Sequence, residues 1–161
     1  MQKLINQSSI LEDNWTFFEK PEQPIAAGNI IIPASQWLEN KASLAGRTDI
    51  GIWLDSDVEI DLYIKEIANL PLIAINFPAF ANGRGYSLAR LIKERTEFKG
   101  ELRAIGDVLL DQLFFMKRCG FDAFLLKEGL SAEKALKYLE TFSDPYQLAY
   151  DRPNPLFRRK G

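Results

Sequence analysis

From residue 49 onward, short apolar runs alternate with amphipathic stretches, and this alternation restricts the possible folds more than any other feature of the chain. The apolar runs have the length of buried strands and lie at 49–54, 71–77, 102–105 and 122–126. After each run, apolar residues recur every three or four positions, which predicts helices over 58–69, 86–97, 107–119 and 132–142. Strands that alternate with helices imply right-handed crossovers and a mostly parallel sheet.

The beginning of the chain is less regular. Segments 15–18 and 28–32 can form two more strands, and 34–44 can form a helix. Residues 1–27 are expected to form an N-terminal extension, and the proline-containing end, 144–161, an extended C-terminal arm.

We therefore predict a single α/β domain over residues 1–161. Its mostly parallel sheet would contain about four or five βα units. The chain is too short for a complete eight-stranded α/β barrel, which typically needs about 250 residues. A flavodoxin-like open sheet and a partial barrel both remain open.

Composition excludes several classes of function. The chain has no histidine and a single cysteine, so imidazole-based triads, an internal disulfide and a multi-cysteine metal cage are excluded. The net charge of −2 gives no reason to expect nucleic-acid binding. There is no apolar run of membrane-spanning length and no signal-peptide pattern at the beginning, so we expect a cytoplasmic protein without a membrane anchor.

The segment after the apolar run 71–77 is the strongest candidate for a binding site. It contains Gly83, Arg84, Gly85, Ser87 and Arg90 at the start of a predicted helix. Backbone N–H groups and the positive end of the helix dipole suit an anion there, and arginine side chains can add further donors. The pattern lacks the third glycine of a dinucleotide fingerprint and the Gly-Lys-Ser/Thr of a P-loop. A tight turn without a ligand is the structural alternative.

Two further residues belong to this candidate site. Asp107 follows the next strand, so it is expected at the same sheet edge, either as an acid/base or as a helix cap. Arg103 lies within an apolar strand, and a buried arginine needs a partner. Asp107, Asp111 or a ligand could be that partner. Cys119 is expected to be buried and inert, and we expect neither a metal nor a cofactor.

Several segments together resemble a bacterial family, the domain-of-unknown-function family nine hundred thirty-four. These segments are Phe77-Pro78-Ala79-Phe80, Gly83-Arg84-Gly85-Tyr86-Ser87-Leu88-Ala89-Arg90-Leu91, Gly100-Glu101-Leu102-Arg103-Ala104, Gly106-Asp107-Val108-Leu109, Asp111-Gln112, Arg118-Cys119-Gly120-Phe121-Asp122-Ala123-Phe124 and Pro155-Leu156-Phe157-Arg158-Arg159. The chain departs from the family pattern at Asn82, where an aspartate usually precedes Gly-Arg-Gly. The resemblance implies a genomic neighbourhood with assimilatory sulfite reductase, but it implies no chemistry.

Two functions follow as expectations, and neither establishes whether the chain is an enzyme. The first is an accessory protein of sulfite reduction that binds sulfite reductase or a redox partner. The acidic N-terminal half, the basic C-terminal half and an arm ending in Arg158 and Arg159 suit such docking. The alternative is a small anion-binding enzyme or sensor that uses Arg84, Gly85, Ser87, Arg90, Arg103 and Asp107.

Overall fold

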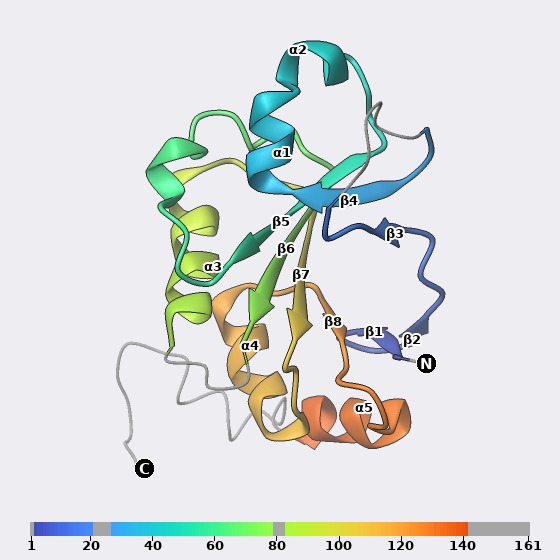
Figure 1. Ribbon diagram of the computed structural model, residues 1–161. Coiled ribbons are helices and arrows are strands. Elements are labelled where there is room, and N and C mark those ends of the chain that lie inside the picture. Colours follow the sequence, from blue (N-terminus) through green and yellow to red (C-terminus); the bar gives the residue numbers. More distant parts are fainter. Residues whose placement is uncertain (1, 21–26, 79–82, 142–161) are drawn as a thin grey trace.

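The predicted alternation of strands and helices is present in the computed structural model, which describes residues 2–20, 27–78 and 83–141 (Figure 1). In chain order, the strands are β1 (Leu4–Asn6), β2 (Ile10–Leu11), β3 (Thr16–Phe17), β4 (Ile30–Pro33), β5 (Ile50–Asp55), β6 (Leu72–Phe77), β7 (Glu101–Gly106) and β8 (Ala123–Leu125). The α-helices are α1 (Ala34–Glu39), α2 (Lys41–Leu44), α3 (Arg84–Arg95), α4 (Leu113–Cys119) and α5 (Ala132–Thr141). Two short 3₁₀ helices cover Ile60–Leu62 and Leu110–Gln112.

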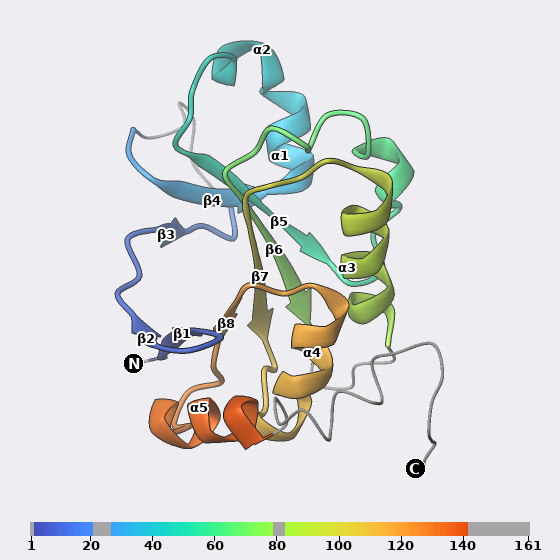
Figure 2. The same ribbon diagram turned by 180° about the vertical axis from the view of Figure 1, so that it is seen from behind.

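All the strands belong to a single sheet with the order β2-β1-β8-β7-β6-β5-β4-β3. Strands β3 to β8 are parallel and lie side by side in chain order, whereas β1 and β2 add an antiparallel hairpin next to β8. Right-handed crossovers that always step in the same direction place their connections on the same face of the sheet. The helices accordingly cover one face (Figures 1 and 2).

This strand order decides between the two architectures that the sequence left open. A flavodoxin-like sheet reverses its strand order and carries helices on both faces, so that alternative is wrong. The predicted mixed α/β class with a mostly parallel sheet is confirmed. Six parallel strands, more than the units expected, form a sheet that curls as a partial barrel does.

Chain connectivity requires the curl. The edge strands β2 and β3 are joined by only four residues, 12–15. This connection spans at most about 18 Å, whereas the outer strands of a flat eight-stranded sheet would be about 34 Å apart. The two edges must therefore approach each other, and residues 12–15, which we call the strap, cross the concave face.

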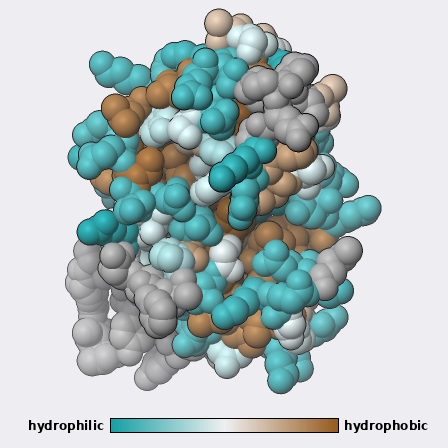
Figure 3. Space-filling model, viewed as in Figure 1, coloured by the Kyte–Doolittle hydropathy of each residue, from teal (hydrophilic) through white to brown (hydrophobic). Residues whose placement is uncertain are grey.

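Alternate side chains of the strands divide the interior into two clusters. The larger cluster lies between the sheet and the helices and includes Ile52, Ile75 and Phe124. The smaller cluster lies on the concave face and consists of Ile31, Leu72, Ala74 and Ile105, with Trp15, Trp53 and Leu125 packed against it. The concave face is thus apolar at its base but carries no helix in the described residues. In the space-filling view, hydrophobic residues show between polar ones on the surface of the molecule (Figure 3).

Most predicted elements from residue 28 onward are present, with one clear error. Helices α3 and α5 lie where the pattern placed them, and 107–119 forms a short 3₁₀ helix followed by α4. The helix predicted over 58–69 is wrong, because only Ile60–Leu62 is helical and the rest forms turns and irregular connections. Val58, Ile60, Ile64 and Ile67 are β-branched residues with reduced helix propensity. Leu62, an apolar residue of the same segment, is 64% exposed.

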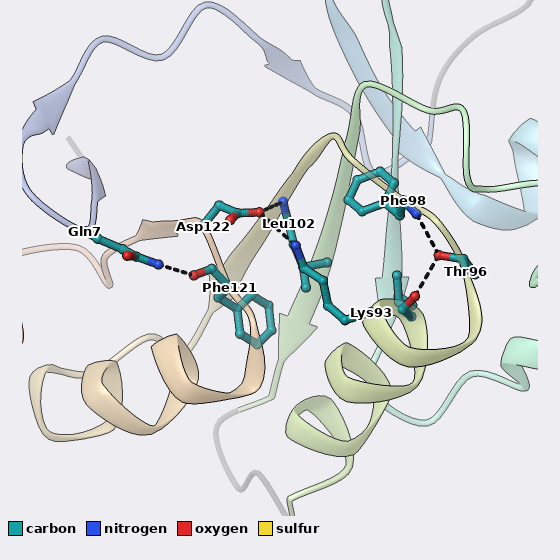
Figure 4. A network of polar contacts seen from close by, with 8 residues as sticks. Gln7, Lys93, Thr96, Phe98, Leu102, Phe121 and Asp122 are labelled. Carbon is teal, nitrogen blue, oxygen red and sulfur yellow. Dashed lines mark hydrogen bonds and ion pairs between the residues drawn. The ribbon is translucent and has the colours of Figure 1, made fainter. Parts of the chain in front are cut away.

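The amino ends of the central strands are held by a polar network (Figure 4). Asp122 Oδ2 accepts a hydrogen bond from the Leu102 backbone N–H at 2.9 Å and lies 3.5 Å from Lys93 Nζ. Gln7 Nε2 donates to the Phe121 carbonyl oxygen at 3.2 Å. These bonds join β7, β8, α3 and the N-terminal hairpin, so this end of the sheet is tied together by structural contacts.

Candidate functional site

A cavity of about 760 Å³ opens on the concave face, between the sheet and the N-terminal segment. Asn76 and Gly106, at the carboxyl ends of β6 and β7, belong to its wall. In α/β folds, ligands bind beyond the carboxyl ends of parallel strands. The volume also falls in the range of about 300–1,000 Å³ that is usual for small-molecule sites. The full lining is Gln2, Lys3, Leu4, Ile10, Leu11, Glu12, Asp13, Phe17, Glu19, Ile31, Trp53, Asn76, Arg103, Ile105, Gly106 and Leu125.

Arg103 lines this cavity as a buried charged residue and is only 2% exposed. Its Nε donates a hydrogen bond to Glu101 Oε2 at 2.6 Å, and its Nη1 donates to Asp13 Oδ1 at 3.1 Å. The expected partner of this buried arginine is therefore present, but it is neither Asp107 nor Asp111. Asp13 belongs to the strap, so this ion pair also fastens the strap to the middle of the sheet.

Two aromatic rings form one wall of the cavity. Phe17 on β3 and Trp53 on β5 have ring centroids 5.5 Å apart, and both line the cavity. Trp53 Nε1 donates a hydrogen bond to the Phe18 carbonyl oxygen at 3.0 Å, which fixes the orientation of the indole. The two rings are tilted by 54° to each other, so this wall is apolar and offers both ring faces and ring edges to an aromatic ligand.

The six predicted anion-site residues do not form one site. Arg84, Gly85, Ser87 and Arg90 belong to α3 in the helical layer, whereas Arg103 lines the cavity on the opposite face of the sheet. Arg84 and Ser87 line a separate, open hollow of about 550 Å³. Asp57 and Glu59, which line the same hollow, would oppose an anion.

The other predicted residues have identifiable structural roles. Gly85 is buried, and a Cβ there would overlap the ring of Phe77, so this position needs glycine for close packing. Ser87 Oγ donates to the Gly83 carbonyl oxygen at 3.4 Å within the same helix. Asp107 forms an ion pair of 2.9 Å with Lys127, on the segment that follows β8. Anion binding by these residues stays a prediction.

The remaining expectations concern metals, the thiol and the arm. Cys119 is buried, as predicted. Within the described residues, no group of His, Cys, Asp and Glu side chains is arranged to hold a metal ion, and no helix has the length and apolarity needed to cross a membrane. Arg158 and Arg159 lie outside the described residues.

A second surface feature lies over α3 and α4, on the helical side. Phe115 is 41% exposed, and two guanidinium groups approach its ring, that of Arg90 at 5.8 Å and that of Arg118 at 6.0 Å from its centroid. Tyr86 meets the same ring edge-on at 4.7 Å. Burial raises the pKa of the Tyr86 phenol, so the ring stays neutral at physiological pH. We call these four residues the Phe115 patch.

Sequence reasoning missed most of the cavity. Asp13, Glu12, Phe17 and Glu19 come from the N-terminal extension, which was not assigned to any site. Arg103 carried the only available signal, since an arginine inside an apolar strand requires a buried acid or a ligand. Nothing local identifies Asp13 as that acid.

Fold and site together define a mixed α/β protein with a curled, mostly parallel sheet and a cavity on its concave face. Residues 51–157 match the sequence model of a family described as bacterial protein of unknown function, DUF934. The match covers more than half of the chain, and the protein belongs to this family. Searches of curated proteins and of solved structures give no significant match.

Proposed function

We propose that this protein is an accessory protein of assimilatory sulfite reduction that docks onto sulfite reductase or a related redox partner. The family resemblance suggests the pathway. The Phe115 patch supports the docking role, because an exposed aromatic ring beside two arginine side chains is the composition of a protein interface centre.

The charge of this surface suggests the kind of partner. Helix α3 contains Arg84, Arg90, Lys93 and Arg95 against a single acid, Glu94. Helix α4 adds two more basic residues in its last turn. An acidic surface on the partner would complement this face and would steer the encounter, so binding should weaken as salt screens the charges.

The test is co-elution of the purified protein with its cognate sulfite reductase at low and moderate salt, both at micromolar concentration. We expect a complex that weakens with salt. Phe115→Ala and Arg90→Glu should each weaken it about tenfold or more, since central aromatic and arginine residues dominate interface energies. Tyr138→Ala removes a similarly exposed aromatic residue from α5 and is the matched control.

Two results would count against the proposal. The first is the absence of a complex at low ionic strength. The second is that the Phe115→Ala and Arg90→Glu variants bind the reductase as tightly as the Tyr138→Ala control. Removing residues 144–161 tests the separate prediction that Arg158 and Arg159 contribute to docking.

A further inference from the structure

The guanidinium of Arg103 has more hydrogen-bond donors than the described residues satisfy. A guanidinium has five N–H groups. The Nε group and one on Nη1 are bonded to Glu101 and Asp13, and in the part of the chain that the structure describes, Nη2 donates to no protein atom. Arg103 is 2% exposed and lines the cavity. Because buried donors are almost always paired, an acceptor is needed inside the cavity.

We propose that the cavity on the concave face binds an uncharged, planar aromatic compound whose carbonyl oxygen accepts a hydrogen bond from Arg103 Nη2. This inference is independent of the docking role, because the cavity and the Phe115 patch lie on opposite faces of the sheet.

The charges around Arg103 require the acceptor to be neutral. Asp13 and Glu101 already place two carboxylates on one guanidinium. Glu12 and Glu19 add two more carboxylates to the cavity wall or its rim, against a single further base, Lys3. An anionic ligand would meet this excess of negative charge at short range. An ammonium group has no lone pair and could not accept from Nη2.

The apolar walls determine the rest of the ligand. Phe17 and Trp53 present neighbouring aromatic rings, and Ile31, Ile105 and Leu125 contribute aliphatic surface. A flat aromatic body can stack or pack edge-on against such rings, with its carbonyl directed to the buried guanidinium. Apolar and aromatic walls combined with a few polar side chains are the usual composition of a small-molecule site.

Three probes that share the naphthalene ring system separate the elements of this proposal. 2-Naphthamide is neutral and has the carbonyl, naphthalene lacks the acceptor, and 2-naphthoate carries a negative charge. Binding of each to the full chain is measured by equilibrium dialysis. We expect 2-naphthamide to bind. Naphthalene should bind about ten- to a hundredfold more weakly, because this factor corresponds to the loss of a hydrogen bond to a charged group. 2-Naphthoate should also bind more weakly than 2-naphthamide, because the carboxylates around Arg103 would repel it.

Variants locate the binding. Leu125→Phe fills part of the cavity without removing a hydrogen bond, so it should lower the affinity for 2-naphthamide at least tenfold. Leu136→Phe makes the same substitution on α5, away from the cavity lining, and should leave the affinity unchanged. Phe115→Ala, which disrupts the proposed docking patch, should also bind 2-naphthamide like the wild type.

Arg103→Met should abolish the preference for 2-naphthamide over naphthalene. If this variant does not fold, the probe series and Leu125→Phe still decide the question. No binding of 2-naphthamide at millimolar concentration overturns the proposal. Equal binding of naphthalene does so too, because water would then satisfy Nη2. Tighter binding of 2-naphthoate, or binding that Leu125→Phe does not affect, also contradicts it.

Discussion

Replacing Asp13 with alanine should destabilise the protein, because this carboxylate fastens the strap to the buried Arg103. Asp13 Oδ1 accepts from Arg103 Nη1 at 3.1 Å and from the Trp15 backbone N–H at 3.0 Å. Removing one partner of a fully buried ion pair costs about 3–5 kcal/mol. The Asp13 side chain is 34% exposed, and Glu101 remains as a second partner. We therefore expect a loss of about 2 kcal/mol, within the range for hydrogen bonds to charged groups.

Urea unfolding at neutral pH measures this loss, and the strap itself provides a control. Glu12 is the neighbouring acid in the same four-residue connection, and no hydrogen bond or ion pair involves its side chain within the described part of the chain. Glu12→Ala should change the free energy of unfolding by no more than about 0.5 kcal/mol, as is usual for surface substitutions. The Asp13→Ala variant should have a lower midpoint with little change in slope.

A double-mutant cycle with Arg103→Met identifies the cause of the loss. If the ion pair is responsible, the two substitutions should be coupled by about 1 kcal/mol or more, because residues in contact are not additive. An Asp13→Ala variant as stable as Glu12→Ala, or strict additivity with Arg103→Met, would refute this stabilising role of the strap.

Three further outcomes can be checked. Gly106→Ala should lower the free energy of unfolding in urea by at least about 3 kcal/mol, since φ is +89° and the new Cβ would overlap the Phe77 carbonyl oxygen. Gly46→Ala, at φ +86° with open space around it, should lower it by only about 1 kcal/mol. Equal losses in the two variants would contradict this explanation. Burial raises the pKa of Tyr86 above its ordinary value of 10.0, so the contribution of the neutral phenol to stability is fully present below pH 10 and is lost as pH rises through the folded-state pKa. Above pH 10 the wild type should therefore lose more stability than Tyr86→Phe, and parallel pH profiles of the two proteins would exclude the effect. The anion-binding alternative predicts that sulfite or sulfate raises the melting temperature and that Arg84→Ala abolishes the rise; no shift with either anion rejects it.

Much of the fold could be predicted from the sequence, because the relevant signals are local. Four apolar runs correspond to β5, β6, β7 and β8, each within one or two residues. Helix α5 begins after Ser131, whose Oγ accepts from the Lys134 backbone N–H at 3.2 Å, as an N-cap serine does. Segment 58–69 has helical periodicity but forms no α-helix, because its β-branched residues lower the helix propensity.

Much less of the candidate site could be predicted. The sequence placed Arg84, Ser87 and Arg103 together. Arg84 and Ser87 follow the carboxyl end of one predicted parallel strand, and Arg103 lies within the next. The structure separates them, because α3 lies on the helical face and the Arg103 side chain is on the concave one. A one-residue difference in strand position exchanges the two faces, and the sequence does not show which face the helices will cover.

The sequence by itself determined the α/β alternation, the family and the need for a partner at Arg103, since these depend on residues close together in the chain or on one residue's chemistry. Tertiary structure alone decided that the sheet curls, that the N-terminal hairpin pairs with β8, and that Asp13 neutralises Arg103 from 90 positions away. These contacts depend on strand order and on the short connection between the two sheet edges. Such long-range geometry follows only when all the strands are assembled, and the cavity forms as its result.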